Sequence, residues 1–330
     1  MQQIIIKENE SGQRMNKFLH KYMPLASDSF IYRMLRKKNI TLNGKKAAGN
    51  EKLNVGDVIS FYLSDETINN FTKKEKNCSE YETAYQKLNG IEIVYEDDHI
   101  ILMNKPAGIL SQKAQPADLS LNEWMIGYLL SEKDIDLKQL ATFKPSICNR
   151  LDRNTMGLVT GAKSLAGSQK MNQLIKNRTI KKFYRMLVKG QVQKEEILEG
   201  FLLKDEENNK VRLVKNGPEA KASYIKTRYY PIKVFSDKTL VEAELITGKS
   251  HQIRIHLAGA GHPLLGDYKY GDRKWNDKYK RAFQVNSQLL YANRLEFPRM
   301  DGCFQNLSEK IIEAPVPEVF RRLMDTERNS

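Results

Sequence analysis

The residues best suited to chemistry lie in one short stretch, residues 149–157, which reads Asn-Arg-Leu-Asp-Arg-Asn-Thr-Met-Gly. A single carboxylate, Asp152, stands between Arg150 and Arg153, ahead of a turn and an apolar strand. Neighbouring guanidinium groups favour the ionised form of an acid, and an ionised, positioned carboxylate can act as a nucleophile. The spacing by itself is more typical of a structural ion pair, so this stretch alone does not establish a catalytic role.

A second polar stretch, residues 247–257, alternates as a strand does, which predicts Gln252, Arg254 and His256 on one face. Arg254 is the strongest donor there for a carboxylate or a phosphate. We expect no metal site, because His251 and His256 would point to opposite sides of such a strand and no third ligand is evident.

Tyr184 is the third candidate and lies in a predicted strand over residues 181–189. Met186 and Val188 share its face, so by itself it is typical of a packed sheet residue.

The length, net charge and composition of the chain indicate which kinds of partner it can bind. The chain has 330 residues, which suggests two domains, and a formal net charge of +14, which favours a polyanion such as nucleic acid. There is no long apolar run and no signal-like N-terminus, so we expect a cytoplasmic protein without a membrane partner. The three cysteines are widely spaced and no nucleotide-binding glycine motif is present, so we expect neither disulfides nor a cofactor.

Residues 13–63 predict a small basic domain of two helices followed by a hairpin at Asn43-Gly44. They contain ten Lys or Arg and three Asp or Glu, an excess of seven, which indicates a phosphate-binding surface rather than only a solvated helix face. With its Leu-Asn-Val-Gly-Asp-Val-Ile ending at residues 53–59, the segment resembles the S-four-type RNA-binding domain. The resemblance places RNA on the second helix and the hairpin, at Arg33, Arg36, Lys37 and Lys38.

The predicted organisation is an RNA-binding domain over residues 1–63, a polar linker over 64–88 with a possible short helix near 81–88, and a second domain over 89–330. The second domain alternates several short strands with helices, which predicts an α+β fold with a mainly antiparallel mixed sheet. Two further basic tracts lie at residues 170–182 and 273–281. Trp275 and Tyr279 interleave the last tract, where they suit either base stacking or a core.

Four motifs in order make the second domain similar to the catalytic domain of the RluA-type pseudouridine synthases. They are residues 149–157, the strand that carries Tyr184, residues 248–256 and the glycine-rich loop at 261–271. The stretch Lys-Pro-Ala-Gly at 105–108 and residues 290–295 match the family too. Asn149, Met156 and Lys249 depart from the family pattern, and none of them removes a side chain on which the chemistry depends.

The resemblance implies roles for the candidate residues. Asp152 would be the catalytic carboxylate, acting on the ribose either as a nucleophile or as a base. Arg254 would pair with Asp152, Tyr184 would stack near the uracil, and Arg150 would enter the RNA stack after the uridine flips out. No metal or cofactor is implied, since the bonds broken and made lie within one nucleotide.

Two other classes of protein fit parts of this pattern. A catalytically silent RNA-binding or ribosome-assembly factor would not need Asp152, Tyr184 and Arg254 together. An aspartate-based glycoside hydrolase would need a second carboxylate as general acid, for which the motif loops offer only Asp267. Family members act on ribosomal and transfer RNA, and the domain in front favours large-subunit ribosomal RNA here. A monomer is the default expectation.

Overall fold

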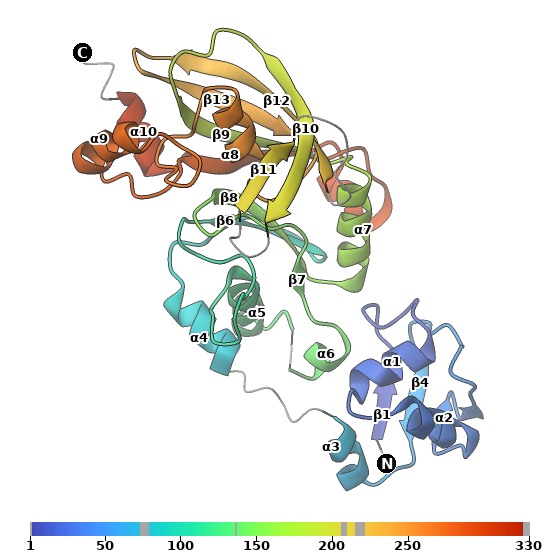
Figure 1. The fold of residues 1–330 in the computed structure, drawn as a ribbon. Coiled ribbons are helices and arrows are strands. Elements are labelled where there is room, and N and C mark those ends of the chain that lie inside the picture. The colour runs from blue at the N-terminus through green and yellow to red at the C-terminus, as the bar shows by residue number, and fades with distance from the viewer. Residues whose placement is uncertain (1, 73–78, 136, 206–209, 215–221, 326–330) are drawn as a thin grey trace.

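The computed structural model describes residues 2–72, 79–135, 137–205, 210–214 and 222–325. Their strands form a four-stranded sheet near the N-terminus and an eleven-stranded sheet in the rest of the chain. Figure 1 shows the first sheet with its helices as a lobe at one end of the molecule.

The N-terminal sheet is antiparallel, in the order β1-β4-β2-β3. Both Asn43 and Gly44 have positive φ (51° and 72°), as the predicted two-residue hairpin turn requires. The Asn43 side chain ties this turn to β4, because its Oδ1 accepts a hydrogen bond from the Val58 amide at 2.7 Å. The elements of this part are β1 (Gln2–Ile5), α1 (Met15–Tyr22), α2 (Asp28–Arg36), β2 (Ile40–Leu42), β3 (Lys45–Lys46) and β4 (Val58–Phe61).

The N-terminal helices form as their apolar spacing predicts. Phe18 and Leu19 of α1 and Ile31 and Leu35 of α2 are buried together against the sheet. Ser27 caps α2 by accepting a hydrogen bond from the Phe30 amide at 3.3 Å, which satisfies one of the free amides of the first turn.

The stretch predicted as a linker contains two helices. The first, α3 (Asp65–Phe71), was not predicted; Ser64 caps it, and Ile68 is buried in the N-terminal core. Its short length and single buried residue give little periodicity for a sequence pattern to reveal. The domain boundaries themselves stay a prediction.

The second helix of this stretch, α4 (Ser79–Lys87), corresponds to the helix predicted near residues 81–88. It packs on α5 (Leu121–Ser131) through a close approach at Gly127. A Cβ at Gly127 would lie 2.3 Å from the Tyr81 carbonyl oxygen, so a larger residue would push the helices apart.

The large sheet runs in the order β11-β10-β12-β13-β9-β14-β8-β6-β5, with β15 beside β14 and β7 beside β8. Its pairs are antiparallel apart from β14 with β8, which confirms the predicted α+β class with a mainly antiparallel mixed sheet. The strands are β5 (Glu92–Glu96), β6 (Ile100–Lys105), β7 (Ser146–Ile147), β8 (Met156–Ala162), β9 (Lys181–Lys189), β10 (Glu196–Asp205), β11 (Lys210–Val214), β12 (Ser223–Val234), β13 (Lys238–Leu245), β14 (Leu290–Glu296) and β15 (Ile311–Glu313).

Helices cover this sheet and connect its strands. Figure 1 shows α9 and α10 side by side at the end away from α1 and α2, and α7 at another edge. The remaining helices are α6 (Leu137–Thr142), α7 (Leu165–Lys176), α8 (Gln252–Gly259), α9 (Arg273–Phe283), the 3-10 helix η1 (Gly302–Leu307) and α10 (Glu318–Asp325).

The strand predicted over residues 247–257 is wrong, because this stretch turns at His251 and continues as α8. His251 has a φ of 56°, and every residue from Gln252 to Leu257 is buried. A helix buried on all sides carries no amphipathic stripe, so its apolar residues can alternate as in a strand. The predicted common face also separates: Gln252 and His256 hydrogen-bond Thr227 of β12, whereas Arg254 points elsewhere.

The third basic tract forms α9, and its aromatic residues are not on the surface. Trp275 and Tyr279 are buried with Phe320 of α10 in one apolar cluster. Of the two roles left open for Trp275, the structure supports the core role.

Candidate active site

Asp152 lies in a loop between β7 and β8 that neighbouring segments hold at several points. Ser111 bonds both the amide and the carbonyl of Leu151, at 3.0 and 2.8 Å. Asn149 accepts a hydrogen bond from the Thr160 amide at 2.8 Å, so this departure from the family pattern anchors the loop to β8. The Thr155 amide bonds the Asp152 carbonyl at 3.0 Å and closes the turn. The loop is therefore fixed before any substrate arrives.

The turn ends at position 157, where the backbone geometry requires glycine. Gly157 has a φ of 102°, and a Cβ there would lie 2.2 Å from the Ala292 carbonyl oxygen on β14. The close parallel approach of β8 and β14 at this point leaves no space for a side chain.

The two arginines that flank Asp152 in sequence do not hold it. The Nε of Arg153 donates to the Gly108 carbonyl at 3.1 Å, and Arg150 is exposed. Among the described residues the cation beside the carboxylate is Arg254, whose Nη1 lies 3.4 Å from the Asp152 Oδ2. The predicted pairing of Arg254 with Asp152 is thus present, whereas the predicted clamp by the flanking arginines is wrong because the turn directs them outward.

Arg254 is itself fixed by Asp267 from the glycine-rich loop. Its Nε and Nη2 donate to the two carboxylate oxygens at 2.7 and 2.8 Å, a two-point contact that sets the plane of the guanidinium. Burial raises the pKa of Asp267, but Arg254 and the amides of Lys269 and Tyr270 more than offset it, so the net pKa is lowered. An ionised, doubly bonded Asp267 cannot serve as a general acid, which removes the second carboxylate that a glycoside hydrolase would need.

His251 approaches Asp152 from the start of α8. Its Nε2 lies 3.8 Å from the Asp152 Oδ2, and its Nδ1 lies 2.8 Å from the Tyr270 hydroxyl. Burial lowers the pKa of His251 despite the nearby Asp152 carboxylate, and burial raises the pKa of Tyr270, so the imidazole is neutral and the hydroxyl keeps its proton. The Tyr270 oxygen already accepts a bond from the Val211 amide at 3.2 Å. A Tyr270 hydroxyl that donates to Nδ1 leaves the imidazole proton on Nε2, facing Asp152.

Lys105, at the end of β6, supports the loop from below. It is fully buried, and its Nζ donates to the carbonyls of Pro106, Ile109 and Arg153 at 3.0, 2.9 and 2.9 Å. Burial lowers the pKa of Lys105 to about 7, although the nearby Asp152 carboxylate acts in the opposite sense. The cation thus joins two chain segments beneath the candidate catalytic residue.

Tyr184 lies in β9, buried between its neighbours in β13 and β14. Burial first and the Asp152 carboxylate second raise the pKa of Tyr184, so its hydroxyl is protonated at neutral pH. Tyr184 belongs to the same buried cluster as Leu151, the residue before Asp152, so the two predicted residues lie in one region of the fold.

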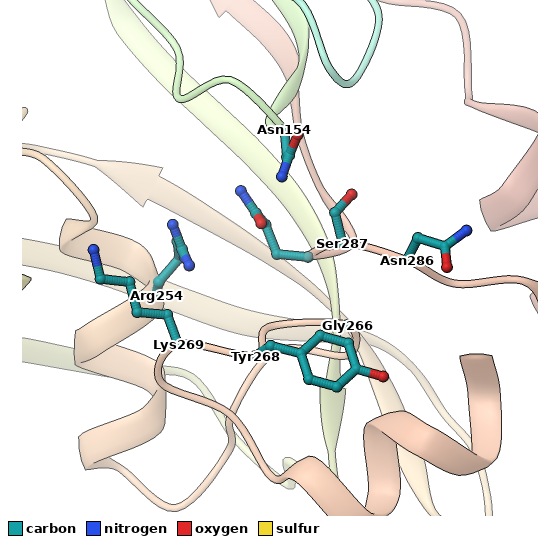
Figure 2. A pocket seen from close by; sticks show the side chains of 8 residues that line it. Asn154, Arg254, Gly266, Tyr268, Lys269, Asn286 and Ser287 are labelled. Carbon is teal, nitrogen blue, oxygen red and sulfur yellow. The ribbon is translucent and has the colours of Figure 1, made fainter.

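A pocket of about 400 Å³ opens beside this group. Figure 2 shows Asn154 and Arg254 pointing into the same space, with Tyr268 across from Asn154. The volume falls within the range of small-ligand pockets. The complete lining is Asn154, Arg254, Gly266, Tyr268, Lys269, Asn286, Ser287 and Gln288.

The predicted RNA-binding residues of the N-terminal part lie together and away from this pocket. Arg33 and Arg36 are in α2, and Lys37 and Lys38 follow it, all exposed. Lys45 and Lys46 in β3 are exposed too. The structure thus groups these cations on accessible surface, and their role in binding RNA stays a prediction.

Sequence reasoning missed part of the site. The supporting roles of four residues depend on contacts between distant segments, namely those of Lys105, Asp267, His251 and Tyr270. The sequence signal for these residues is their position inside family motifs: Lys105 opens the Lys-Pro-Ala-Gly stretch, His251 lies in residues 248–256, and Asp267 and Tyr270 lie in the glycine-rich loop. Among the described residues, no group of three or more His, Cys, Asp or Glu could hold a metal ion, and no helix is long and apolar enough to span a membrane.

Comparison with known proteins identifies the family of the chain. The family model described as RNA pseudouridylate synthase matches residues 99–259, which include Asp152, Tyr184 and Arg254. The ribosomal large subunit pseudouridine synthase C of Vibrio cholerae is 32% identical over 320 residues, covering 96% of this chain and 93% of that protein. The protein of the same name from Escherichia coli is 29% identical over 329 residues, covering 99% and 97%.

The fold is also shared with a solved structure, that of human RNA pseudouridylate synthase domain containing 4. The TM-score is 0.58 at 19% identity, and the match covers 76% of this chain and 97% of that one. The chain belongs to the RNA pseudouridine synthases, which are isomerases. It is similar over nearly its whole length to the large-subunit enzymes named above.

Proposed function

We propose that this protein converts specific uridines of large-subunit ribosomal RNA to pseudouridine, with Asp152 as its catalytic carboxylate. The observation that carries the proposal is the carboxylate of Asp152, placed beside an open pocket by a buried Arg254–Asp267 pair. The choice of ribosomal RNA is supported by relatives that are named as ribosomal large subunit enzymes and align over nearly the whole chain. Such a substrate implies a cytoplasmic protein.

In this proposal the uridine is flipped into the pocket, at a cost of about a few kcal/mol. Asp152 either attacks the anomeric carbon or removes a ribose proton, and the bond from that carbon to the uracil N1 breaks with its electron pair on N1. The uracil turns and its C5 bonds the anomeric carbon, either as the ester bond between Asp152 and that carbon breaks or, in the second route, as Asp152 returns the proton to the ribose. The C5 proton is then transferred so that N1 ends protonated. Arg254, 3.4 Å from the Asp152 carboxylate, would orient it toward the ribose.

Tyr184 and Arg150 complete the proposed site. The Tyr184 ring would stack near the uracil, and its hydroxyl would assist the final proton transfer. The exposed Arg150 would fill the space that the uridine leaves in the RNA stack. The N-terminal S-four-like domain would bind neighbouring RNA through its exposed cations.

The test is carbodiimide-dependent pseudouridine mapping of total RNA from cells with and without the gene. We expect signals at one or a few large-subunit ribosomal uridines to disappear on deletion, and to return with the wild-type gene but not with Asp152→Asn. Loss at transfer RNA instead would overturn the proposed substrate. No change at any uridine would favour a silent RNA-binding protein.

The binding control separates chemistry from recognition. Purified Asp152→Asn is expected to bind the same ribosomal RNA within a few-fold of the wild-type affinity, because Asp152 contributes no positive charge. Full activity of this variant would refute the catalytic role.

A further inference from the structure

Helix α9 presents two chemically different sides. Its inner side is anchored to the sheet: Asp237 accepts hydrogen bonds from Trp275 Nε1 at 3.2 Å and from the Tyr279 hydroxyl at 2.8 Å. Asp272 caps its first turn by accepting from the Trp275 amide at 3.0 Å. The long charged side chains of α9 that are exposed are all cations, namely Arg273, Lys274, Lys278, Lys280 and Arg281.

Three of these cations line one hollow. Lys274, Lys278, Arg281 and the small Ala282 surround a space of about 390 Å³. The spacing i, i+4, i+7 places the three cations along one helix face over about 10 Å, which is longer than the distance between adjacent phosphates of a strand. Lys278 lies 3.6 Å from Asp237, but it is 71% exposed and that carboxylate is already bonded to Trp275 and Tyr279.

The same helix adjoins the pocket beside Asp152. Tyr268 lines that pocket (Figure 2), and its hydroxyl donates to Asp277 of α9 at 3.0 Å. The Nζ of Lys280 lies 5.8 Å from the centre of the Tyr268 ring. A chain that leaves the pocket past Tyr268 therefore meets α9.

We propose that the outer face of α9 binds the phosphates of the substrate RNA next to the modified uridine. This inference rests on the proposed function and adds a second RNA contact, on the side of the molecule away from α1 and α2 (Figure 1). The partner is RNA because the face is adjacent to a nucleotide-sized pocket in an RNA-modifying enzyme and offers cations in a row, without exposed apolar groups for a lipid or protein surface. Fixing the helix by its buried aromatics keeps the row preorganised.

The test is the salt dependence of RNA binding by full-length protein. The variant carries Lys274→Gln, Lys278→Gln and Arg281→Gln. The matched control carries Lys87→Gln, Lys133→Gln and Lys194→Gln, three exposed lysines elsewhere, of which Lys194 also has a carboxylate neighbour, Glu196 at 3.8 Å. Both are titrated with labelled single-stranded poly(U) and with large-subunit ribosomal RNA transcribed in vitro, over a series of KCl concentrations.

Three lost phosphate contacts should make the slope of log affinity against log salt shallower by about 2. The control should keep the wild-type slope, and the turnover rate of the α9 variant at saturating RNA should stay within about two-fold. An unchanged slope, or an equal change in the control, would overturn the proposal. An unfolding midpoint equal to that of the wild type confirms that the variant is folded.

The outcomes also separate this inference from the proposed function. A shallower slope in a protein that forms no pseudouridine would support the α9 contact and refute the enzyme. Normal pseudouridine formation with an unchanged slope would refute the α9 contact alone. Tighter retention on anionic lipid vesicles than on RNA would identify a membrane as the partner and refute the inference.

Discussion

The Asp152 site and the end of α2 both depend on positive charge, yet they hold it in opposite ways. The side chain of Arg254 is 8% exposed and is bonded twice to Asp267, which is 1% exposed. The cations at the end of α2, from Arg33 to Lys38, are exposed, and Arg33 only overlies the Phe30 ring, at 5.6 Å. The first arrangement fixes a direction in space, whereas the second would offer adaptable charge to the RNA that we propose as the partner of this surface.

The difference predicts different costs of change. In the site, removing one charge leaves a buried charge without its close partner, so the free energy of unfolding and the activity fall together. At the end of α2, each cation contributes a small and salt-screened share, so changes appear in affinity rather than in turnover.

The largest effect is expected from Asp267→Asn. It leaves the buried Arg254 cation with only the more distant Asp152 carboxylate, at 3.4 Å, as a counter-ion, which should lower the free energy of unfolding by up to about 3–5 kcal/mol. Pseudouridine formation should fall at least about 100-fold, because Arg254 is no longer aligned on Asp152. Urea unfolding and single-turnover rates measure the two effects.

The control is the double variant Arg254→Met with Asp267→Leu. It should regain most of the lost stability, since an apolar pair can replace a buried ion pair, but it should remain inactive. A stable and active Asp267→Asn would show that the pair does not position Asp152.

The next effect concerns Tyr184, whose hydroxyl is removed in Tyr184→Phe. The ring stays in its buried place, so stability should change by less than about 1.5 kcal/mol, while the turnover rate should drop by about 100-fold if the hydroxyl assists a proton transfer. Rapid-quench assays at saturating RNA give the rate. A turnover equal to that of the wild type would leave Tyr184 with a packing role only.

A smaller effect is expected in the pH dependence of stability through Lys105. Its pKa is about 7 in the folded protein and 10.5 in the unfolded chain, so between these values the unfolded chain binds more protons. The wild-type protein should therefore gain about 2 kcal/mol of stability from about pH 7 to about pH 9, relative to Lys105→Met. Urea titrations of both proteins at the two pH values test this, and a difference that is constant with pH would contradict it.

The sequence predicted the elements whose patterns are local. Strand β9 has the predicted bounds, and Asn43-Gly44 makes the predicted hairpin. Strand β10 has no strict alternation to mark it, and its pairing with β12 and β11 is a tertiary property. The alternation over α8 predicts a strand because burial on every side removes the amphipathic pattern of a helix.

In the candidate site, too, local motifs could be predicted from the sequence, and contacts between distant segments could not. Family motifs identified Asp152, Tyr184 and Arg254, and the structure brings these distant positions together. They could not reveal that Arg254 is held by Asp267, or that Arg153 turns toward Gly108, since both depend on where loops meet. Adjacency to Asp152 in sequence suggested the wrong cations.

The smallest effect on catalysis is expected at the end of α2, where the contrast with the site can be tested directly. Changing Arg33, Arg36, Lys37 and Lys38 to glutamine should make the salt slope of RNA binding shallower by up to about 3. Turnover at saturating RNA should stay within about two-fold, because no buried group loses a partner. Filter binding over a KCl series and saturating single-turnover assays provide both numbers, with the Lys87, Lys133 and Lys194 triple variant as control. A lost turnover with an unchanged slope would mean that these exposed cations act on the site, and the division of labour between fixed and adaptable charge would then be wrong.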